Sequence, residues 1–264
     1  MKRWKLLSLL VSLCLLLTAL PGVVASAEGD PVADVLVQAR LLYNQGRGLD
    51  ALELLSSARE SMDDERLDTA ITKLINSQNR RTEQIAYASD GSIVVHYSYL
   101  YSDEGRKISY SSHDDTGMTT LAYDYDDDGL LTGYIVYQPN DPDAALEYWA
   151  EVELDACGDP IRVVTYDDEG VRGSFEYENN EYGEAVVIRR FDRDGNLSSA
   201  STYTFDDYGI WTSIDTDYPG RRPVHAVFDL QYEFDDDGHL RHVEGIQNGR
   251  FVGVEYSFTY IPFP

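Results

Sequence analysis

A short turn-forming pattern recurs along most of this chain. An aromatic or aliphatic residue is followed by Asp or Asn, two further polar residues and Gly. An Asp or Asn at the start of a turn can accept a hydrogen bond from the backbone two residues on, and Gly adopts positive φ without a Cβ clash. The pattern therefore predicts β-hairpin turns. The best copies are Tyr125–Gly129, Tyr166–Gly170, Phe191–Gly195, Phe205–Gly209 and Phe234–Gly238.

The spacing of the turns predicts the number of strands. Looser copies end at Gly91, Gly105, Gly117, Gly158, Gly183 and Gly220, and most neighbouring copies lie 11–14 residues apart. Two more turn signals, at Asn140-Asp141-Pro142-Asp143 and at Asn248-Gly249, complete the series. About 14 strands of roughly eight residues follow from this spacing.

Alternation along the predicted strands indicates one apolar face. In residues 225–234, apolar residues at 226, 228, 230, 232 and 234 alternate with mostly polar ones. A broad sheet with one apolar face cannot lie flat in water, so it must curl into a barrel or sandwich, or be covered by helices. For residues 81–264 we predict a mainly β fold, a curled antiparallel meander of about 14 strands built from hairpin repeats.

The turns resemble the YD, or Rhs-type, tyrosine-aspartate-glycine repeats of bacterial secreted and cell-surface proteins. The likeness is best from Phe191-Asp-Arg-Asp-Gly195-Asn-Leu197 through Tyr203-Thr-Phe-Asp-Asp-Tyr-Gly209. The period of about 12 residues is shorter than the family's, and the toxin and processing regions of large members are missing. The resemblance therefore implies a repeat architecture more than an activity.

The N-terminal segment has the layout of a secretory signal peptide. Lys2, Arg3 and Lys5 precede an apolar run over residues 6–20, and Ala25-Ser26-Ala27 offers a cleavage site. The apolar run is too short for a stable membrane span. We expect residues 1–27 to be removed and the protein to be secreted or held at an extracytoplasmic cell surface.

The net charge limits the classes of possible partner, and the cysteine content excludes an internal disulfide. The chain carries 47 Asp and Glu against 21 Lys and Arg, a formal net charge of −26. Loss of the three bases in residues 1–27 would leave 18 − 47 = −29. Such a surface repels nucleic acid and anionic lipid. Without Cys14, the remaining Cys157 cannot form an internal disulfide, so we interpret it as an unpaired thiol in a turn.

Residues 28–80 have helical periodicity. Asp30-Pro31 is a plausible helix start, Gly46 and Gly48 interrupt the pattern, and three short helices are predicted before a polar linker. The stretch from Ala39 to Ala58 resembles one tetratricopeptide repeat. A solenoid of such repeats needs about three, so the helices either pack as a small bundle or dock a partner.

The sequence contains little that indicates a catalytic site. There is no Gly-x-Ser-x-Gly motif, and the five histidines are scattered. We therefore predict a non-catalytic binding or surface-structural module with a protein or glycan partner, and assign no catalytic residue. A carbohydrate-binding protein is the alternative, in which Tyr97, Tyr99 and Tyr101 would stack on sugar. The simpler interpretation places these tyrosines in the core.

Two acidic stretches resemble parts of calcium-binding loops. Asp124, Asp126 and Asp128 match the first half of such a loop, as do Glu233, Asp235 and Asp237, with Glu244 at the twelfth position. A repeat that places Asp in hairpin turns also produces this pattern without a metal. Solvated turns are our default interpretation, calcium is the alternative, and no other cofactor is expected.

Overall fold

The protein is described from a computed structural model that covers residues 29–76, 81–102, 106–115, 117–137, 148–236, 240–247 and 250–258. Two compact units are distinguished, residues 1–30 and residues 31–264. The second unit contains all the helices and strands described below. The predicted signal peptide, residues 1–27, lies outside the described residues.

Three helices come first among the described residues of the second unit, as predicted. They are α2 (Pro31–Asn44), α3 (Gly48–Ser61) and α4 (Glu65–Ile75). Gly46, at φ +81°, ends the first helical segment. The carboxylate of Asp64 caps α4 by accepting the backbone N–H of Arg66 at 3.0 Å. None of the helices in the described residues is long and apolar enough to cross a bilayer.

Within the described ranges, fourteen strands follow, which confirms the number of about 14 predicted from the turns. They are β1 (Arg81–Tyr87), β2 (Ile93–Tyr101), β3 (Lys107–Asp114), β4 (Gly117–Tyr125), β5 (Leu131–Tyr137), β6 (Tyr148–Leu154), β7 (Pro160–Asp167), β8 (Gly170–Asn179), β9 (Ala185–Phe191), β10 (Leu197–Phe205), β11 (Trp211–Asp217), β12 (Val224–Phe234), β13 (Leu240–Gln247) and β14 (Arg250–Phe258).

The sheet closes into a barrel. Each strand pairs antiparallel with the next, and β14 pairs with β1, for example through Gln84 opposite Tyr256. The predicted curled meander is therefore wrong in one respect, because the first and last strands are not free edges. Closure pairs backbone groups that an open sheet would leave exposed.

The hairpin turns have the predicted chemistry. Gly129, Gly158 and Gly195 all adopt positive φ, between +80° and +84°. In the turn after β9, Oδ1 of Asp192 accepts the backbone N–H groups two and four residues on, at 3.0 and 2.8 Å. The same pattern recurs at Asp206, where the distances are both 2.9 Å. The repeated sequence thus encodes the turn itself.

Aromatic side chains line the inside of the barrel, and the outside carries charged side chains together with exposed apolar ones such as Leu100, Val227 and Ile246. Tyr99 of β2 stacks on Tyr110 of β3 with ring centroids 5.9 Å apart, so the structure supports the core interpretation of the tyrosine stripe. Burial raises the pKa of Tyr134, and Tyr148 and Tyr177 raise it further, the latter from three strands away. These phenols therefore point into a shared interior.

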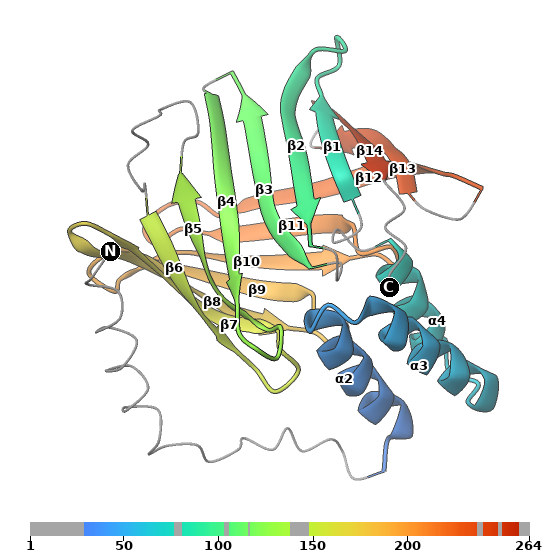
Figure 1. The fold of residues 1–264 in the computed structure, drawn as a ribbon. Coiled ribbons are helices and arrows are strands. Elements are labelled where there is room, and N and C mark those ends of the chain that lie inside the picture. The colour runs from blue at the N-terminus through green and yellow to red at the C-terminus, as the bar shows by residue number, and fades with distance from the viewer. Residues whose placement is uncertain are drawn as a thin grey trace, which may run out of the picture. The chain divides into compact units, whose positions relative to one another are not determined.

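The helices, here called the cap, lie together at one end of the barrel (Figure 1). Their buried core includes Leu36, Ala51, Leu55 and Leu67, and Tyr182 of the β8–β9 turn packs against it. Alternate hairpins of an up-and-down barrel lie at opposite ends. The last residues of β2, β4, β6, β8, β10 and β12 lie at the capped end, and the last residues of the odd-numbered strands lie at the far end.

Candidate functional site

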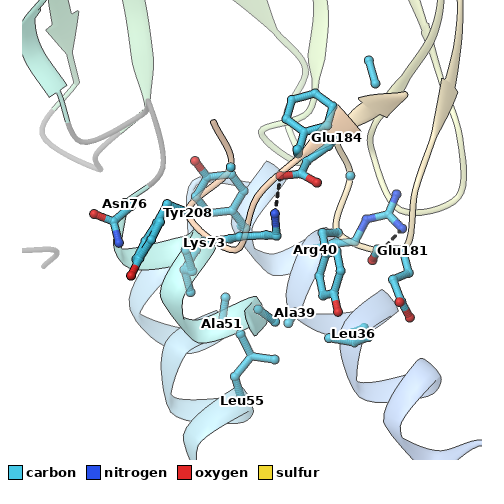
Figure 2. Close-up of a pocket in the computed structure, with 18 of the residues that line it drawn as sticks. Leu36, Ala39, Arg40, Ala51, Leu55, Lys73, Asn76, Glu181, Glu184 and Tyr208 are labelled. Carbon is cyan, nitrogen blue, oxygen red and sulfur yellow. Dashed lines mark hydrogen bonds and ion pairs between the residues drawn. The ribbon is translucent and has the colours of Figure 1, made fainter. Parts of the chain in front are cut away.

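A cavity of about 440 Å³ lies between the cap and the inner wall of the barrel (Figure 2). We call it the cap cavity. Small and aliphatic side chains of the helices form one side, and aromatic side chains of the barrel form the other. The helix side includes Leu36, Ala39, Ala51, Leu55, Ala70 and Leu74, and the barrel side includes Ile188, Tyr203, Phe205, Tyr208 and Trp211.

The aromatic wall is held together by ring contacts. The Tyr203 ring lies 5.5 Å from the Trp211 ring and 6.5 Å from the Phe205 ring, measured between centroids. Tyr208 lies 4.8 Å from Phe234 in the same way. Such tilted pairs are favourable arrangements, so this side of the cavity has a defined shape.

A single ion pair accounts for two of the charges at the cavity. Nζ of Lys73 lies 2.6 Å from Oε1 of Glu184, and the two side chains are only 12% and 14% exposed. Lys73 also donates to the backbone oxygen of Asp206 and lies 5.3 Å from the centre of the Tyr182 ring. The pair ties α4 to two hairpins of the capped end.

Tyr182 contributes a neutral phenol to the cavity. Burial, together with the neighbouring Glu181, raises the pKa of Tyr182 to about 12. The phenol therefore stays protonated at neutral pH. It adds a ring and a hydroxyl to the lining without adding charge.

A second anchor joins α2 to the β6–β7 and β8–β9 turns. The Arg40 guanidinium pairs with Asp159 and donates to the backbone oxygen of Glu181 at 3.3 Å. Asn44 donates to Asp159 and to the backbone oxygen of Cys157, both at 2.9 Å. These contacts fix the position of α2 over the barrel interior.

One group of metal-capable side chains occurs in the described part of the chain. Ligand atoms of Asp155, Cys157 and Asp159 lie within 4.8 Å of one another. Asp155 already accepts two backbone N–H groups, and Asp159 accepts from Arg40 and Asn44. Burial raises the pKa of the free Cys157 thiol. The contacts present make this cluster part of the cap anchor.

The first predicted calcium stretch forms an ordinary hairpin. Asp124 is exposed on β4, and Asp126 and Asp128 are exposed in the following turn. Oδ1 of Asp126 accepts the backbone N–H of Leu130 at 2.8 Å. This is the turn role expected of Asp without a metal.

The second predicted stretch is distributed over two strands. Glu233 on β12 and Glu244 on β13 are exposed, and Oδ2 of Asp235 lies 3.4 Å from Nε of Arg241. Asp237 lies outside the described residues. Calcium binding by either stretch stays a prediction.

The ion pairs of the cap were missed from the sequence. Lys73 and Glu184 are 111 positions apart, and Arg40 and Asp159 are 119 apart. No local pattern connects such residues. The available signal was the scarcity of bases, since a cation within an apolar segment of so acidic a chain indicates a specific partner.

Comparison with known proteins gives partial structural likenesses and no family. No protein-family model and no curated protein matches the chain. A porin-like protein from Bacteroides uniformis is 15% identical, with 69% of this chain and 97% of that chain covered and a TM-score of 0.42. A porin-like protein from Bacteroides vulgatus is 8% identical, with 68% and 99% covered and a TM-score of 0.41.

The resemblances drawn from the sequence need correction. The YD or Rhs-type assignment is wrong, because the strands form one closed barrel in place of an open series of hairpin repeats. Its signal came from the hairpin turn, which any antiparallel barrel with this spacing requires. The tetratricopeptide assignment is also unsupported, since the three helices share one core and pack on a barrel turn through Tyr182.

Proposed function

We propose that this protein is an exported, non-catalytic binding protein that holds a small apolar molecule in the cap cavity. The observation that carries the proposal is the cavity itself. Its volume of about 440 Å³ falls in the range of ~300–1,000 Å³ usual for small-molecule sites. Its walls combine aliphatic helix residues with Tyr203, Phe205 and Trp211, and the Lys73–Glu184 pair neutralises two of its charges.

Charged side chains on the outer face of the barrel favour exposure of that face to water. Charged side chains such as Glu151, Arg162, Asp215 and Asp229 lie exposed within the strands. They alternate with inward residues such as Ala150 and Ala226, which are buried. Barrels that span membranes have the opposite arrangement, an apolar outer band around a polar interior. With the predicted export segment, this polarity favours an extracytoplasmic, water-exposed barrel.

The lining of the cap cavity supports binding without catalysis. Among its described lining residues there is no Ser, Thr, Cys or His. Those residue types supply many nucleophiles and general bases, alongside Asp, Glu, Lys and Tyr. Of the charged lining residues, Lys73 pairs with Glu184, and Arg40 pairs with Asp159.

The test is a fluorescence titration of the mature chain with N-phenyl-1-naphthylamine, a neutral apolar probe. A Trp149→Phe background leaves Trp211, in the cavity wall, as the tryptophan of residues 28–264. We expect saturable probe emission with energy transfer from Trp211.

A pair of variants locates the probe. Ala70→Phe fills part of the cavity and should weaken binding at least about tenfold, the effect of losing more than one kcal/mol. The control is Ala200→Phe, because Ala200 pairs with Asp217 on the outer side of β10. Equal binding by both variants would contradict the proposal.

The carbohydrate-binding alternative has one observation in its favour. Trp149 and Tyr166 stack on the outer face at 5.6 Å and 14°, and the Tyr166 hydroxyl donates to Glu151 at 3.1 Å. Aromatic rings beside a carboxylate suit sugar recognition. Binding on a glycan array that Trp149→Ala abolishes would favour this alternative over the apolar ligand.

A further inference from the structure

A second cavity, of about 180 Å³, lies between the α2–α3 connection and the barrel strands β3, β4 and β5. Two cations, Arg106 and Lys107, line it together with the tyrosines 43, 123 and 125. Among its described lining residues there is no Asp or Glu. This is unusual for a chain with a formal net charge of −26.

Lys107 points into the barrel from the start of β3. Its Nζ lies 5.2 Å from the centre of the Tyr99 ring of β2 and 5.9 Å from that of Tyr123 of β4. Among the described residues, no carboxylate oxygen lies within ion-pair distance of the Lys107 Nζ. Aromatic faces attract a cation but do not neutralise it.

The neighbouring charge that acts on Lys107 is also positive. Burial, and secondarily the charge of Arg81 on β1, lower the pKa of Lys107 to about 8. Arg106, the preceding residue, donates from Nε to the backbone oxygen of Gln45 at 3.3 Å. The titratable groups around Lys107 are therefore Tyr99, Tyr123 and Arg81, with Tyr43 and Tyr125 in the same cavity lining. The Arg106 guanidinium lies beside Gly129, in the acidic turn that follows β4.

We propose that this cavity is a binding site for a small oxyanion, a phosphate or carboxylate group, held by the Lys107 ammonium, with Arg106 in the lining of the same cavity. Charge-assisted hydrogen bonds to such groups are strong where water is largely excluded. The cavity is smaller than typical sites for drug-sized ligands, of ~300 Å³ or more. It therefore suits a free oxyanion or the charged head of a larger molecule.

The site is independent of the apolar ligand proposed for the cap cavity. Arg106 and Lys107 do not line the cap cavity, although Tyr43 lines both. Loss of one site should leave the other measurable. Probe binding by N-phenyl-1-naphthylamine is expected to persist when Lys107 is replaced.

The experiment is calorimetry of the mature chain with inorganic phosphate, at constant ionic strength set by sodium chloride. We expect saturable binding at pH 6.5 that weakens at least about tenfold at pH 9.5, where Lys107 is mostly neutral. Phosphate itself carries more negative charge at pH 9.5, so weaker binding at that pH would come from loss of the positive charge on the protein. Acetate in a parallel titration shows which oxyanion class binds more tightly.

Variants separate the site from general surface attraction. Lys107→Met should reduce phosphate binding at least about tenfold, and Lys107→Arg should retain it. Arg193→Gln is the matched control, because Arg193 is an exposed cation at the far end. The proposal is overturned if wild type gives no saturable heat, or if Lys107→Met and wild type bind phosphate equally. If circular dichroism shows that Lys107→Met does not fold, the comparison of wild-type phosphate binding at pH 6.5 and pH 9.5 tests the proposal by itself.

Discussion

The two ends of the barrel use the same turn for different purposes. At the capped end, Oδ1 of Asp155 accepts the backbone N–H groups of Cys157 and Asp159 at 2.8 and 3.0 Å. At the far end, Asp192 makes the matching pair of bonds at 3.0 and 2.8 Å. Gly158 and Gly195 have nearly the same φ, +81° and +80°. The backbone of the two turns is therefore equivalent.

What differs is the surroundings of the turn side chains. Asp159 is buried and lies against Arg40 and Asn44 of the cap. Asp194 and Asn196 of the far-end turn are exposed. Local sequence thus determines the turn, and the packing of distant helices determines whether its acids become structural. The predictions below test this difference.

The largest contrast is expected between two arginines. Arg40→Met leaves the buried Asp159 carboxylate without its guanidinium partner, so the free energy of unfolding should fall by about 3–5 kcal/mol. Arg193 pairs with Asp167 and Glu169 at the far end but is 47% exposed. Arg193→Met should cost about 0–1 kcal/mol. Urea unfolding measures both, and equal losses would show that the cap is not anchored through Arg40.

Two glycines give a matched backbone comparison. Both Gly158→Ala and Gly195→Ala place a Cβ at positive φ, at a cost of about 1–2 kcal/mol. At Gly158 the new Cβ would also lie 2.8 Å from Leu130 and 3.1 Å from the Cβ of Asn44, whereas nothing lies within 4 Å at Gly195. Overlap should add about 1–3 kcal/mol at Gly158 alone. Thermal unfolding with equal shifts for both variants would refute contact between α2 and this turn.

One interior cation, Lys107, and one exposed cation, Arg190, extend the comparison to the effect of pH on stability. Lys107 has a pKa lowered to about 8, so the charged form is unfavourable in the folded state. Lys107→Met should raise the free energy of unfolding at pH 7 by about 1–3 kcal/mol. Arg190, an exposed cation 5.8 Å from the Phe175 ring, serves as the control, and Arg190→Met should change stability by about 0.5 kcal/mol or less.

The sign of the pH effect follows from proton binding. Between pH 8 and about 10.5 the unfolded chain holds more protons on Lys107 than the folded chain does, so wild-type stability gains with rising pH. The advantage of Lys107→Met should be complete below pH 8 and vanish near pH 10.5. A constant difference across this window would contradict the lowered pKa of Lys107.

Much of the fold could be predicted because its information is local. The Asp and Gly of each turn determine hairpin geometry, and alternation in residues such as Ala226 and Asp229 separates the faces. Closure could not be predicted, because the pairing of Gln84 with Tyr256 joins the two ends of the sheet. An open and a closed sheet have the same local pattern.

The site was less accessible to sequence reasoning. Its ion pairs join residues more than 100 positions apart, such as Lys73 and Glu184. The sequence instead indicated the acidic stretches as candidate calcium sites, although Asp126 already has a role in its turn. Once the register of β2 and β3 is known, strand alternation places the Lys107 side chain on the inner face of the barrel, among the tyrosines.

Hydrogen–deuterium exchange, with and without saturating N-phenyl-1-naphthylamine, tests most directly whether the cap cavity is the binding site. We expect the probe to slow exchange in α2, α4 and the turns at 180–184 and 206–210, which surround the cavity. The far-end turns at 167–170 and 192–196 should be unaffected. Protection confined to the far end, or no protection in the cap while the probe is bound, would contradict the account.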